Sequence, residues 1–141
     1  MTLEVYTLTN PHVLYVEDDA LSREVMEALF RRRLGYQNIT VFENSDGFMG
    51  KLNQLTPEPD VIFLDIHMEP IDGFEMLRQI REDTTFCAAK VVALTASVMN
   101  EEVKMLREAG FDGVLAKPLD VDAFPGALKR ILAGEQVWII K

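Results

Sequence analysis

The sequence predicts an α/β fold in which helices cover both faces of a five-stranded parallel sheet. Short apolar and β-branched runs alternate with segments of helical periodicity along the chain. Each helix can form the right-handed crossover that returns the next strand in the same direction. The 141 residues, of which 48% are hydrophobic, suit a single domain. The expected architecture is a doubly wound, flavodoxin-like three-layer sandwich with strand order 2-1-3-4-5.

The first βα unit shows the pattern most clearly. A strand is expected at His12 to Glu17, where a mostly apolar run ends in acid. The helix expected at Ala20 to Leu34 has apolar residues at helical spacing. Arginines at 31–33 suit the negative end of the helix dipole, and Gly35 ends the helix.

The alternation then continues through four more units. A loop with Pro57 and Pro59 separates the second unit from the third. The remaining expected elements are a strand at Ile39 to Phe42, a helix from about Ser45 to Leu55, a strand at Val61 to Asp65, a helix at Gly73 to Arg81, a strand at Val91 to Thr95, a helix at Met99 to Ala109, a strand at Val114 to Lys117 and a helix at Val121 to Leu132.

Three parts of the chain are expected, without an internal repeat or a long linker. They are an N-terminal extension at 1–11, which contains strand-like Leu3, Val5 and Leu8, a globular domain at 12–134 and an apolar C-terminal tail at 135–141. The tail residues Val137 to Ile140 are too apolar for a solvated end, so we expect them to pack onto their own domain. A partner surface or homodimer contact through Trp138 is the second interpretation.

Composition excludes several classes of protein. With 14 Lys and Arg against 23 Asp and Glu, the net charge of −9 repels nucleic acid and anionic lipid. No apolar run reaches the ~20 residues of a membrane span, and Met1 to Thr9 lacks the pattern of a secretion signal. Cys87 is the single cysteine, which excludes an internal disulfide. We therefore expect a cytoplasmic protein without membrane insertion or direct nucleic-acid binding.

Polar residues follow the strands at the carboxyl edge of the predicted sheet, where ligands bind in this topology. Strands 1 and 3 are neighbours, so Glu17, Asp18 and Asp65 would bring three carboxylates together. Like charges so close together raise one another's pKa or demand a cation, and Mg²⁺ prefers oxygen ligands. We expect Asp19 to serve only as the helix N-cap.

Two further strand ends point to the same edge. Lys117 would bind a phosphoryl oxygen there or pair with Asp65, and a cis bond to Pro118 would aim its side chain. Thr95 would add a hydroxyl. The alternatives are a solvated lysine and a threonine that merely packs.

From His12 to about Gly134 the chain resembles the receiver domain of two-component response regulators. The matching motifs are V-E-D-D at 16–19, D-I-H-M-E-P-I-D-G at 65–73, T-A at 95–96 and K-P at 117–118. The resemblance implies that a sensor histidine kinase or a phosphotransfer protein phosphorylates Asp65. The implied Mg²⁺ ligands are Glu17 through water, Asp18, Asp65 and the backbone carbonyl of His67. Thr95 and Lys117 would bind the phosphoryl oxygens.

The same resemblance implies a signalling module of a two-component system. Such a domain catalyses only its own phosphorylation and dephosphorylation, and turns over no separate substrate. The added charge of the aspartyl phosphate would draw Thr95 inward and reshape the segment after strand 4. No output domain follows residue 134, so we expect a stand-alone receiver that signals by contact with a downstream protein.

Three positions depart from the family pattern. Val114 stands where the family has a switch aromatic, and Phe111 is the nearby substitute. Four residues after Asp65, where the family often has proline, this chain has Glu69, and Pro70 follows it. The ring of His67 would either influence phosphoryl lifetime or lie in solvent. The alternative function is a receiver-like scaffold that acts without phosphorylation. An Asp-nucleophile phosphohydrolase is disfavoured because His67 replaces the acid/base aspartate, and a flavin carrier because acids replace its phosphate loop.

Overall fold

The computed structural model describes residues 11–139 of the chain. Of the expected extension at 1–11 only Pro11 is described, so Leu3, Val5 and Leu8 lie outside the described residues. Ile140 of the expected tail lies outside them as well.

All strands within residues 11–139 join one parallel sheet in the order β2-β1-β3-β4-β5-β6. The predicted order 2-1-3-4-5 is confirmed, and one strand extends it. The strands are β1 (Val13–Val16), β2 (Ile39–Phe42), β3 (Val61–Asp65), β4 (Lys90–Thr95), β5 (Gly113–Ala116) and β6 (Val137–Ile139).

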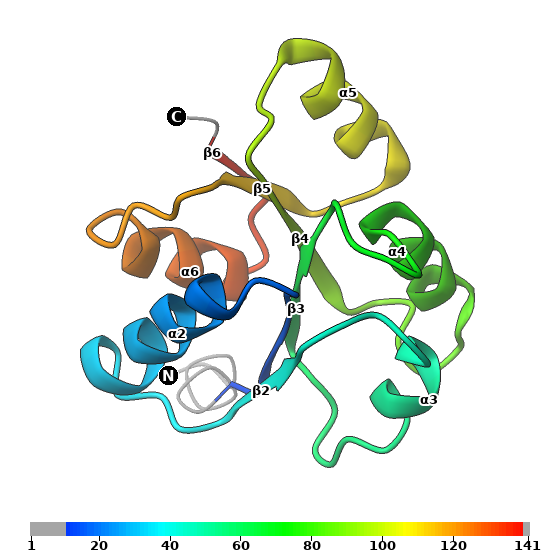
Figure 1. Ribbon diagram of the computed structural model, residues 1–141, viewed down its shortest axis with the longest axis horizontal. Coiled ribbons are helices and arrows are strands. Elements are labelled where there is room, and N and C mark those ends of the chain that lie inside the picture. The colour runs from blue at the N-terminus through cyan, green and yellow to red at the C-terminus, as the bar shows by residue number, and fades with distance from the viewer. Residues whose placement is uncertain (1–10, 140–141) are drawn as a thin grey trace.

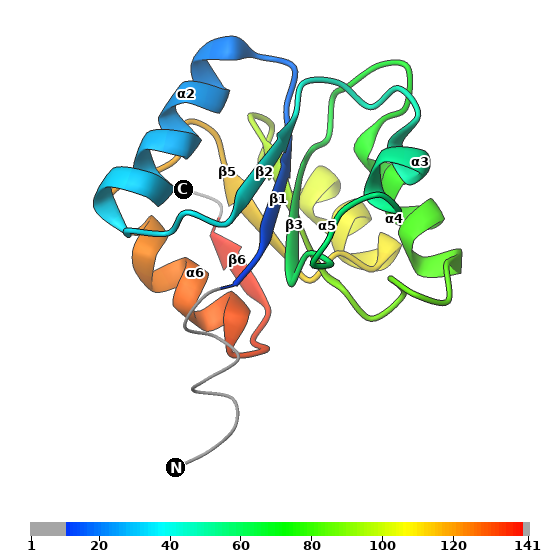
Figure 2. The same ribbon diagram turned by 90° about the horizontal axis from the view of Figure 1, so that it is seen from below.

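The helices cover both faces of this sheet, as predicted (Figure 1). They are α2 (Ala20–Ala28), the π-helical turn η1 (Leu29–Arg33), α3 (Phe48–Leu52), α4 (Gly73–Glu82), α5 (Asn100–Ala109) and α6 (Phe124–Leu132). Figure 2 shows α2 and α6 on one face and α3, α4 and α5 on the other. Within residues 11–139, none of these helices combines the length and the apolar character that a membrane crossing requires.

The central strands are buried on both faces because their alternate side chains enter two different cores. In β1, Leu14 and Val16 pack under α3, α4 and α5, whereas Val13 and Tyr15 pack under α2 and α6. All four side chains are at most 1% exposed. The charged residues of the central strands therefore lie at the strand ends, and the site forms there.

The helix expected at Ala20 to Leu34 is helical through Arg33, but its last five residues form a π turn. After Ala28 the chain forms η1, in which the Leu34 amide donates to the Leu29 carbonyl at 3.0 Å. The wider π turn buries Leu29 and Phe30 together against the sheet. Apolar spacing alone does not distinguish such a turn from a regular α-helical one.

The helix expected from Ser45 to Leu55 is shorter than predicted. Gly47 has a φ of +61°, a left-handed conformation that an α-helix cannot contain, so α3 begins at Phe48. Ser45 is buried, and its hydroxyl accepts a hydrogen bond from the Ile71 amide at 2.9 Å. The other boundaries lie within three residues of those expected.

The apolar tail packs onto its own domain, as expected, and does so as the sixth strand. Val137 pairs with Gly113, and Trp138 pairs with Val114. The indole of Trp138 packs at the edge of the core under α5, and the Arg107 guanidinium lies 4.4 Å from the ring centroid. At Gly113 a Cβ atom would lie 2.5 Å from the Val137 carbonyl oxygen, so only glycine permits this close pairing.

We predict that Gly113→Ala separates β6 from β5 and lowers the free energy of unfolding by about 2 kcal/mol. Thermal unfolding measures the loss, and the emission of Trp138, the sole tryptophan, should shift to the red. The control is Gly126→Ala in α6, where a Cβ meets nothing within 4 Å; it should leave stability unchanged or raise it by up to about 1 kcal/mol. An unshifted emission in Gly113→Ala would contradict this account of the pairing.

Candidate functional site

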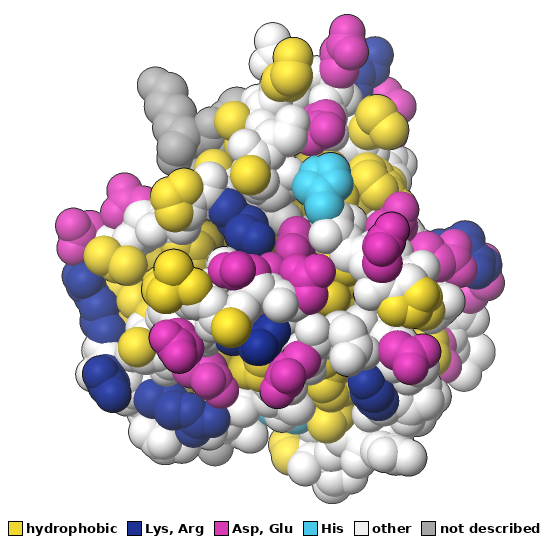
Figure 3. Space-filling view, in the orientation of Figure 1, with side chains coloured by type: hydrophobic (Ala, Val, Ile, Leu, Met, Phe, Trp, Pro, Cys, Tyr) yellow, Lys and Arg dark blue, Asp and Glu magenta, His cyan; other side chains and the backbone are white. Residues whose placement is uncertain are grey.

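Three carboxylates meet at the carboxyl edge of the sheet. Val16 pairs with Leu64, so the next residues, Glu17 and Asp65, leave β1 and β3 side by side. Oxygen atoms of Glu17, Asp18 and Asp65 all lie within 4.8 Å of one another. In the view of Figure 3, acidic side chains gather near the middle of the face with basic side chains beside them.

Glu17 is the most enclosed member of the cluster, with 0% of its side chain exposed. Its Oε1 accepts hydrogen bonds from the Tyr15 hydroxyl at 2.7 Å and from the Lys117 ammonium at 2.9 Å. Among the residues that the structure describes, only the Asp19 amide donates to its Oε2, in a longer bond of 3.3 Å. Lys117 Nζ lies 3.6 Å from Asp65 Oδ2, so the lysine pairs more closely with Glu17 than with Asp65.

The two central carboxyls have opposite shifts in pKa. Burial, reinforced by the neighbouring Glu17, raises the pKa of Asp65 to about 6, although Lys117 opposes the rise. Burial also acts to raise the pKa of Glu17, but the sharing of a proton held by Asp65, together with the hydrogen bonds from Lys117 and Tyr15, outweighs it and lowers the value. Glu17 therefore carries the stable negative charge, and Asp65 loses its proton reluctantly.

The donor groups around Glu17 keep their protons. Burial disfavours the charged form of Lys117, but the bond to Glu17 and the charge of Asp65 outweigh it and raise the pKa of the ammonium. Burial and the bond to Glu17 raise the pKa of the Tyr15 hydroxyl. Both groups thus remain hydrogen-bond donors near neutral pH.

The cluster fits a hard divalent cation. Its three side chains offer carboxylate oxygens, the ligands that Mg²⁺ prefers, and the raised pKa of Asp65 reflects the cost of a charge buried beside Glu17, which a cation would offset. Asp18 is exposed and lines an open depression of about 550 Å³ together with Ile66 and His67. The cluster is therefore open to solvent on the Asp18 side.

Asp19 is the N-cap of α2, as predicted. Its carboxylate accepts hydrogen bonds from the Ser22 amide at 2.8 Å and from the Ser22 hydroxyl at 2.7 Å. These bonds lower the pKa of Asp19. The residue therefore has a local structural role beside the three clustered acids.

Thr95 and Lys117 lie at the same sheet edge as the acids. Thr95 pairs with Ala116, the residue before Lys117, and the Lys117 amide donates to the Thr95 carbonyl at 2.8 Å. The Thr95 hydroxyl is buried and exchanges hydrogen bonds with the backbone of Ser97. The Lys117–Pro118 peptide is cis, the conformation that would aim the lysine side chain.

His67 and Glu69, in the loop after β3, contribute to the site in different ways. The His67 amide donates to Asp65 Oδ1 at 3.2 Å, while its side chain is exposed, in agreement with the solvent interpretation. Glu69 is also exposed, borders the depression that contains Asp18 and precedes a cis bond to Pro70. An extra negative charge therefore stands at the rim of the site.

Two aromatic side chains lie close to Val114, the residue that replaces the family's switch aromatic. Phe111 is buried and packs edge-to-face on Phe74 of α4, with ring centroids 5.9 Å apart. The aromatic residue beside Val114 is Trp138 in β6, its register partner. Register partners on adjacent parallel strands share a face, so the indole lies on the α5 side of the sheet.

Sequence reasoning missed Tyr15 as part of the site. A signal was present, because Tyr15 and Glu17 are two residues apart at the end of one strand and thus point to the same face. In a buried strand, however, a tyrosine is expected to be an aromatic core residue. Its contact with Glu17 becomes visible only in the structure.

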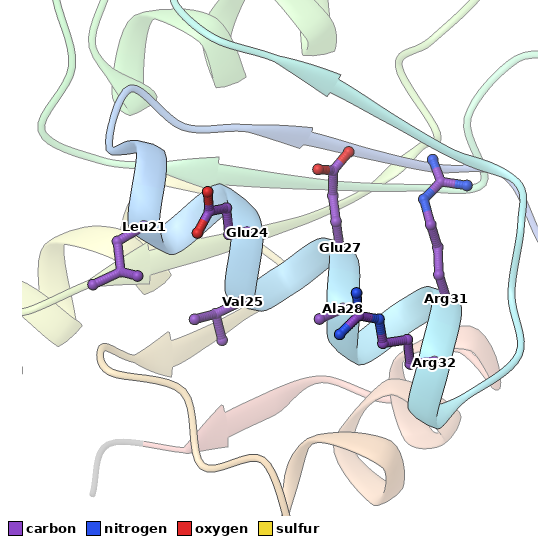
Figure 4. Close-up of a pocket in the computed structure, with 7 residues that line it drawn as sticks. All are labelled: Leu21, Glu24, Val25, Glu27, Ala28, Arg31 and Arg32. Atoms are coloured by element: carbon purple, nitrogen blue, oxygen red, sulfur yellow. The ribbon is translucent and has the colours of Figure 1, made fainter.

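The outer surface of α2 is apolar close to this site. Figure 4 shows Leu21 and Val25 along a groove that Glu24, Glu27 and two arginines border. Leu21 is 65% exposed and Val25 is 40% exposed. A second, smaller cavity of about 140 Å³ connects this surface with Tyr15 and Lys117.

Comparisons with known proteins agree with the geometry. The model of the response regulator receiver domain matches residues 13–129. The transcriptional regulatory protein CseB of Streptomyces coelicolor is 30% identical over 121 residues, 86% of this chain and 49% of CseB. The osmosensing histidine protein kinase SLN1 of Saccharomyces cerevisiae is 30% identical over 114 residues, 79% of this chain and 9% of SLN1. This chain thus spans half or less of the length of these two relatives.

A solved structure gives the same result. The receiver domain of a sensor histidine kinase from Pseudomonas aeruginosa, determined with a magnesium ion coordinated in its active site cleft, is 26% identical. It matches with a TM-score of 0.76 over 89% of this chain and 99% of that one. Because the family model covers most of the chain, we conclude that the protein belongs to the family of response regulator receiver domains of two-component systems.

Proposed function

We propose that this receiver domain accepts a phosphoryl group on Asp65 from a sensor histidine kinase or a phosphotransfer protein, and signals by contact with a downstream protein. The observation that carries the proposal is the grouping of the Asp65 carboxylate with two further acids and an ammonium 3.6 Å away. Phosphoryl transfer needs mainly positioning and neutralisation of charge, and this grouping supplies both.

In the proposed reaction an Asp65 carboxylate oxygen attacks the phosphorus of a phosphohistidine. The phosphorus–nitrogen bond breaks, the donor imidazole leaves, and an aspartyl phosphate forms. Attack by water on phosphorus later restores the carboxylate and releases inorganic phosphate. The domain thus acts only on itself and is a signalling module without a separate substrate.

The surrounding residues have distinct roles in this proposal. Glu17, Asp18, Asp65 and the backbone carbonyl of His67 would hold Mg²⁺, which supplies positive charge for the phosphoryl oxygens. Lys117 would turn from Asp65 Oδ2 toward a phosphoryl oxygen. Thr95 would exchange its hydrogen bonds to Ser97 for a bond to the phosphoryl group.

The movement of Thr95 offers a route to an output. Ser97 and Met99 connect Thr95 with the start of α5, and Met99 is 71% exposed. Release of Ser97 would therefore alter the exposed surface at the beginning of this helix. We propose a downstream protein as the target, since the net charge of −9 repels nucleic acid.

The donor protein would approach beside α2. Its phosphohistidine has to reach Asp65, and the exposed side chains of Leu21 and Val25 provide the adjacent apolar contact surface. The receiver domain then corresponds to the proposed unit at 12–134, and the reaction would occur in the cytoplasm, where nucleoside triphosphates charge the kinase.

We predict that incubation with Mg²⁺ and acetyl phosphate adds one acid-stable, base-labile phosphoryl group, detected by intact mass spectrometry. Asp65→Asn should abolish the addition. The control Asp46→Asn should retain it, because the exposed Asp46 side chain has no hydrogen bond or ion pair to any described residue. A wild-type chain that stays unmodified with small donors and with kinases would instead favour the scaffold that works without phosphorylation.

We also predict that Asp65→Asn stabilises the protein in EDTA at pH 7.5. The pKa of about 6 exceeds the usual 3.8, so the folded state holds the Asp65 proton more tightly than the unfolded state does. The free energy of unfolding therefore falls as the pH rises from about 4 to 6. Above pH 6 Asp65 is ionised in both states, and the full cost of its buried charge is reached.

Two pH units correspond to at most about 3 kcal/mol. We expect the variant to gain about 1 to 2 kcal/mol at pH 7.5, because Asn also loses the attraction to Lys117. Thermal unfolding should show the gain shrinking at pH 4.5 and on addition of Mg²⁺. A gain that is equal at both pH values would contradict the assigned cost of ionising Asp65 in its buried position beside Glu17.

A further inference from the structure

The hydroxyl of Tyr15 forms a direct contact with the acidic site. The ring is buried in the core under α2 and α6, and only 1% of the residue is exposed. The hydroxyl donates to Glu17 Oε1 at 2.7 Å, a distance typical of a strong bond between a hydroxyl and a carboxylate. A phenylalanine would fill this part of the core equally well, so packing alone does not account for the hydroxyl.

The contacts of Glu17 divide its two oxygens into different classes. Oε1 receives both Tyr15 and Lys117, at 2.7 and 2.9 Å, and these two donors use the available lone pairs. Oε2 receives only the Asp19 amide at 3.3 Å. It is therefore the oxygen with remaining capacity for a cation shared with Asp18 and Asp65.

We propose that Tyr15 is a positioning residue for the magnesium site: its hydroxyl fixes Glu17 with Oε1 on Lys117 and presents Oε2 to the cation. This inference rests on the proposed function.

A water molecule would be a poor substitute for this hydroxyl. The Tyr15 oxygen is attached to a ring that the core holds in place, so its position is fixed before the cation binds. The adjacent cavity of about 140 Å³, lined by Tyr15, Lys117 and Leu21, can supply water to Oε1 once the hydroxyl is removed. We thus expect Tyr15→Phe to fold while Glu17 loses its fixed orientation.

The test compares Tyr15→Phe with Tyr36→Phe in the full chain. Tyr36 is half-buried and its ring lies 6.0 Å from that of Phe30, but its hydroxyl has no hydrogen bond to a described residue. Isothermal titration with MgCl₂ measures the affinity directly. Phosphorylation by acetyl phosphate over a range of Mg²⁺ concentrations separates half-saturation from the maximal rate.

We expect Tyr15→Phe to raise the Kd for Mg²⁺ about five- to tenfold, consistent with a lost bond to a charged group. The maximal rate at saturating Mg²⁺ should stay within twofold of wild type, and Tyr36→Phe should change neither quantity. A double-mutant cycle tests the route. In the Glu17→Gln background, Tyr15→Phe should weaken binding by less than twofold, since Tyr15 acts through the Glu17 carboxylate.

A measurement on the unmutated chain tests the inference even if Tyr15→Phe does not fold. The hydroxyl proton of Tyr15 should appear in proton NMR spectra as a slowly exchanging signal that shifts on titration with Mg²⁺. Unchanged affinity in Tyr15→Phe, equal weakening in both backgrounds, or a hydroxyl signal that ignores Mg²⁺ would overturn the inference alone. A wild type that binds no Mg²⁺ would overturn the proposed function together with it.

Discussion

A single buried ion pair sets the geometry of the acidic edge. Lys117 follows β5 and Glu17 follows β1, and these strands are separated in the sheet by β3 and β4. The lysine reaches across that gap to Glu17, at 2.9 Å, and in doing so places its ammonium near Asp65 at the end of β3. Loss of either partner would leave a charge uncompensated in a place from which water is largely excluded, so the positions of three strand ends depend on one contact.

The parts of the fold that could be predicted from the sequence are those encoded locally. Apolar runs specified the strands, and because parallel strands end at one edge, the convergence of Glu17, Asp18 and Asp65 followed from topology. The N-cap role of Asp19 was also local. The remaining features depend on contacts between distant residues. Nothing near Lys117 indicates that it pairs more closely with Glu17 than with Asp65, and nothing near Tyr15 distinguishes a core ring from a ring whose hydroxyl bonds to an acid.

The sixth strand illustrates the same distinction at the sheet edge. An apolar tail predicts burial but not a partner, and pairing with β5 depends on the absence of a side chain at Gly113, which is far away in sequence. Pairing then sets Trp138 beside Val114 and under Arg107 of α5. The edge of β5 is thereby covered. The contact between Arg107 and Trp138 connects α5, the helix after Thr95, with β6, and no residue of β5 supplies such an aromatic contact.

The opposite behaviour of Glu17 and Asp65 explains how one pocket can contain both a ligand and a nucleophile. Glu17 receives two short hydrogen bonds on one oxygen, and these stabilise its anion. Asp65 receives one bond of 3.2 Å from the His67 amide and faces an ammonium at 3.6 Å, so its lone pairs are less engaged. A carboxylate with weaker hydrogen bonds is more basic and thus more nucleophilic, whereas a strongly bonded one is suited to hold a cation. The asymmetry arises because both carboxyls are buried, but the interaction with Asp65 and the donors Lys117 and Tyr15 stabilise the anion of Glu17, whereas the nearby Glu17 adds to the effect of burial at Asp65.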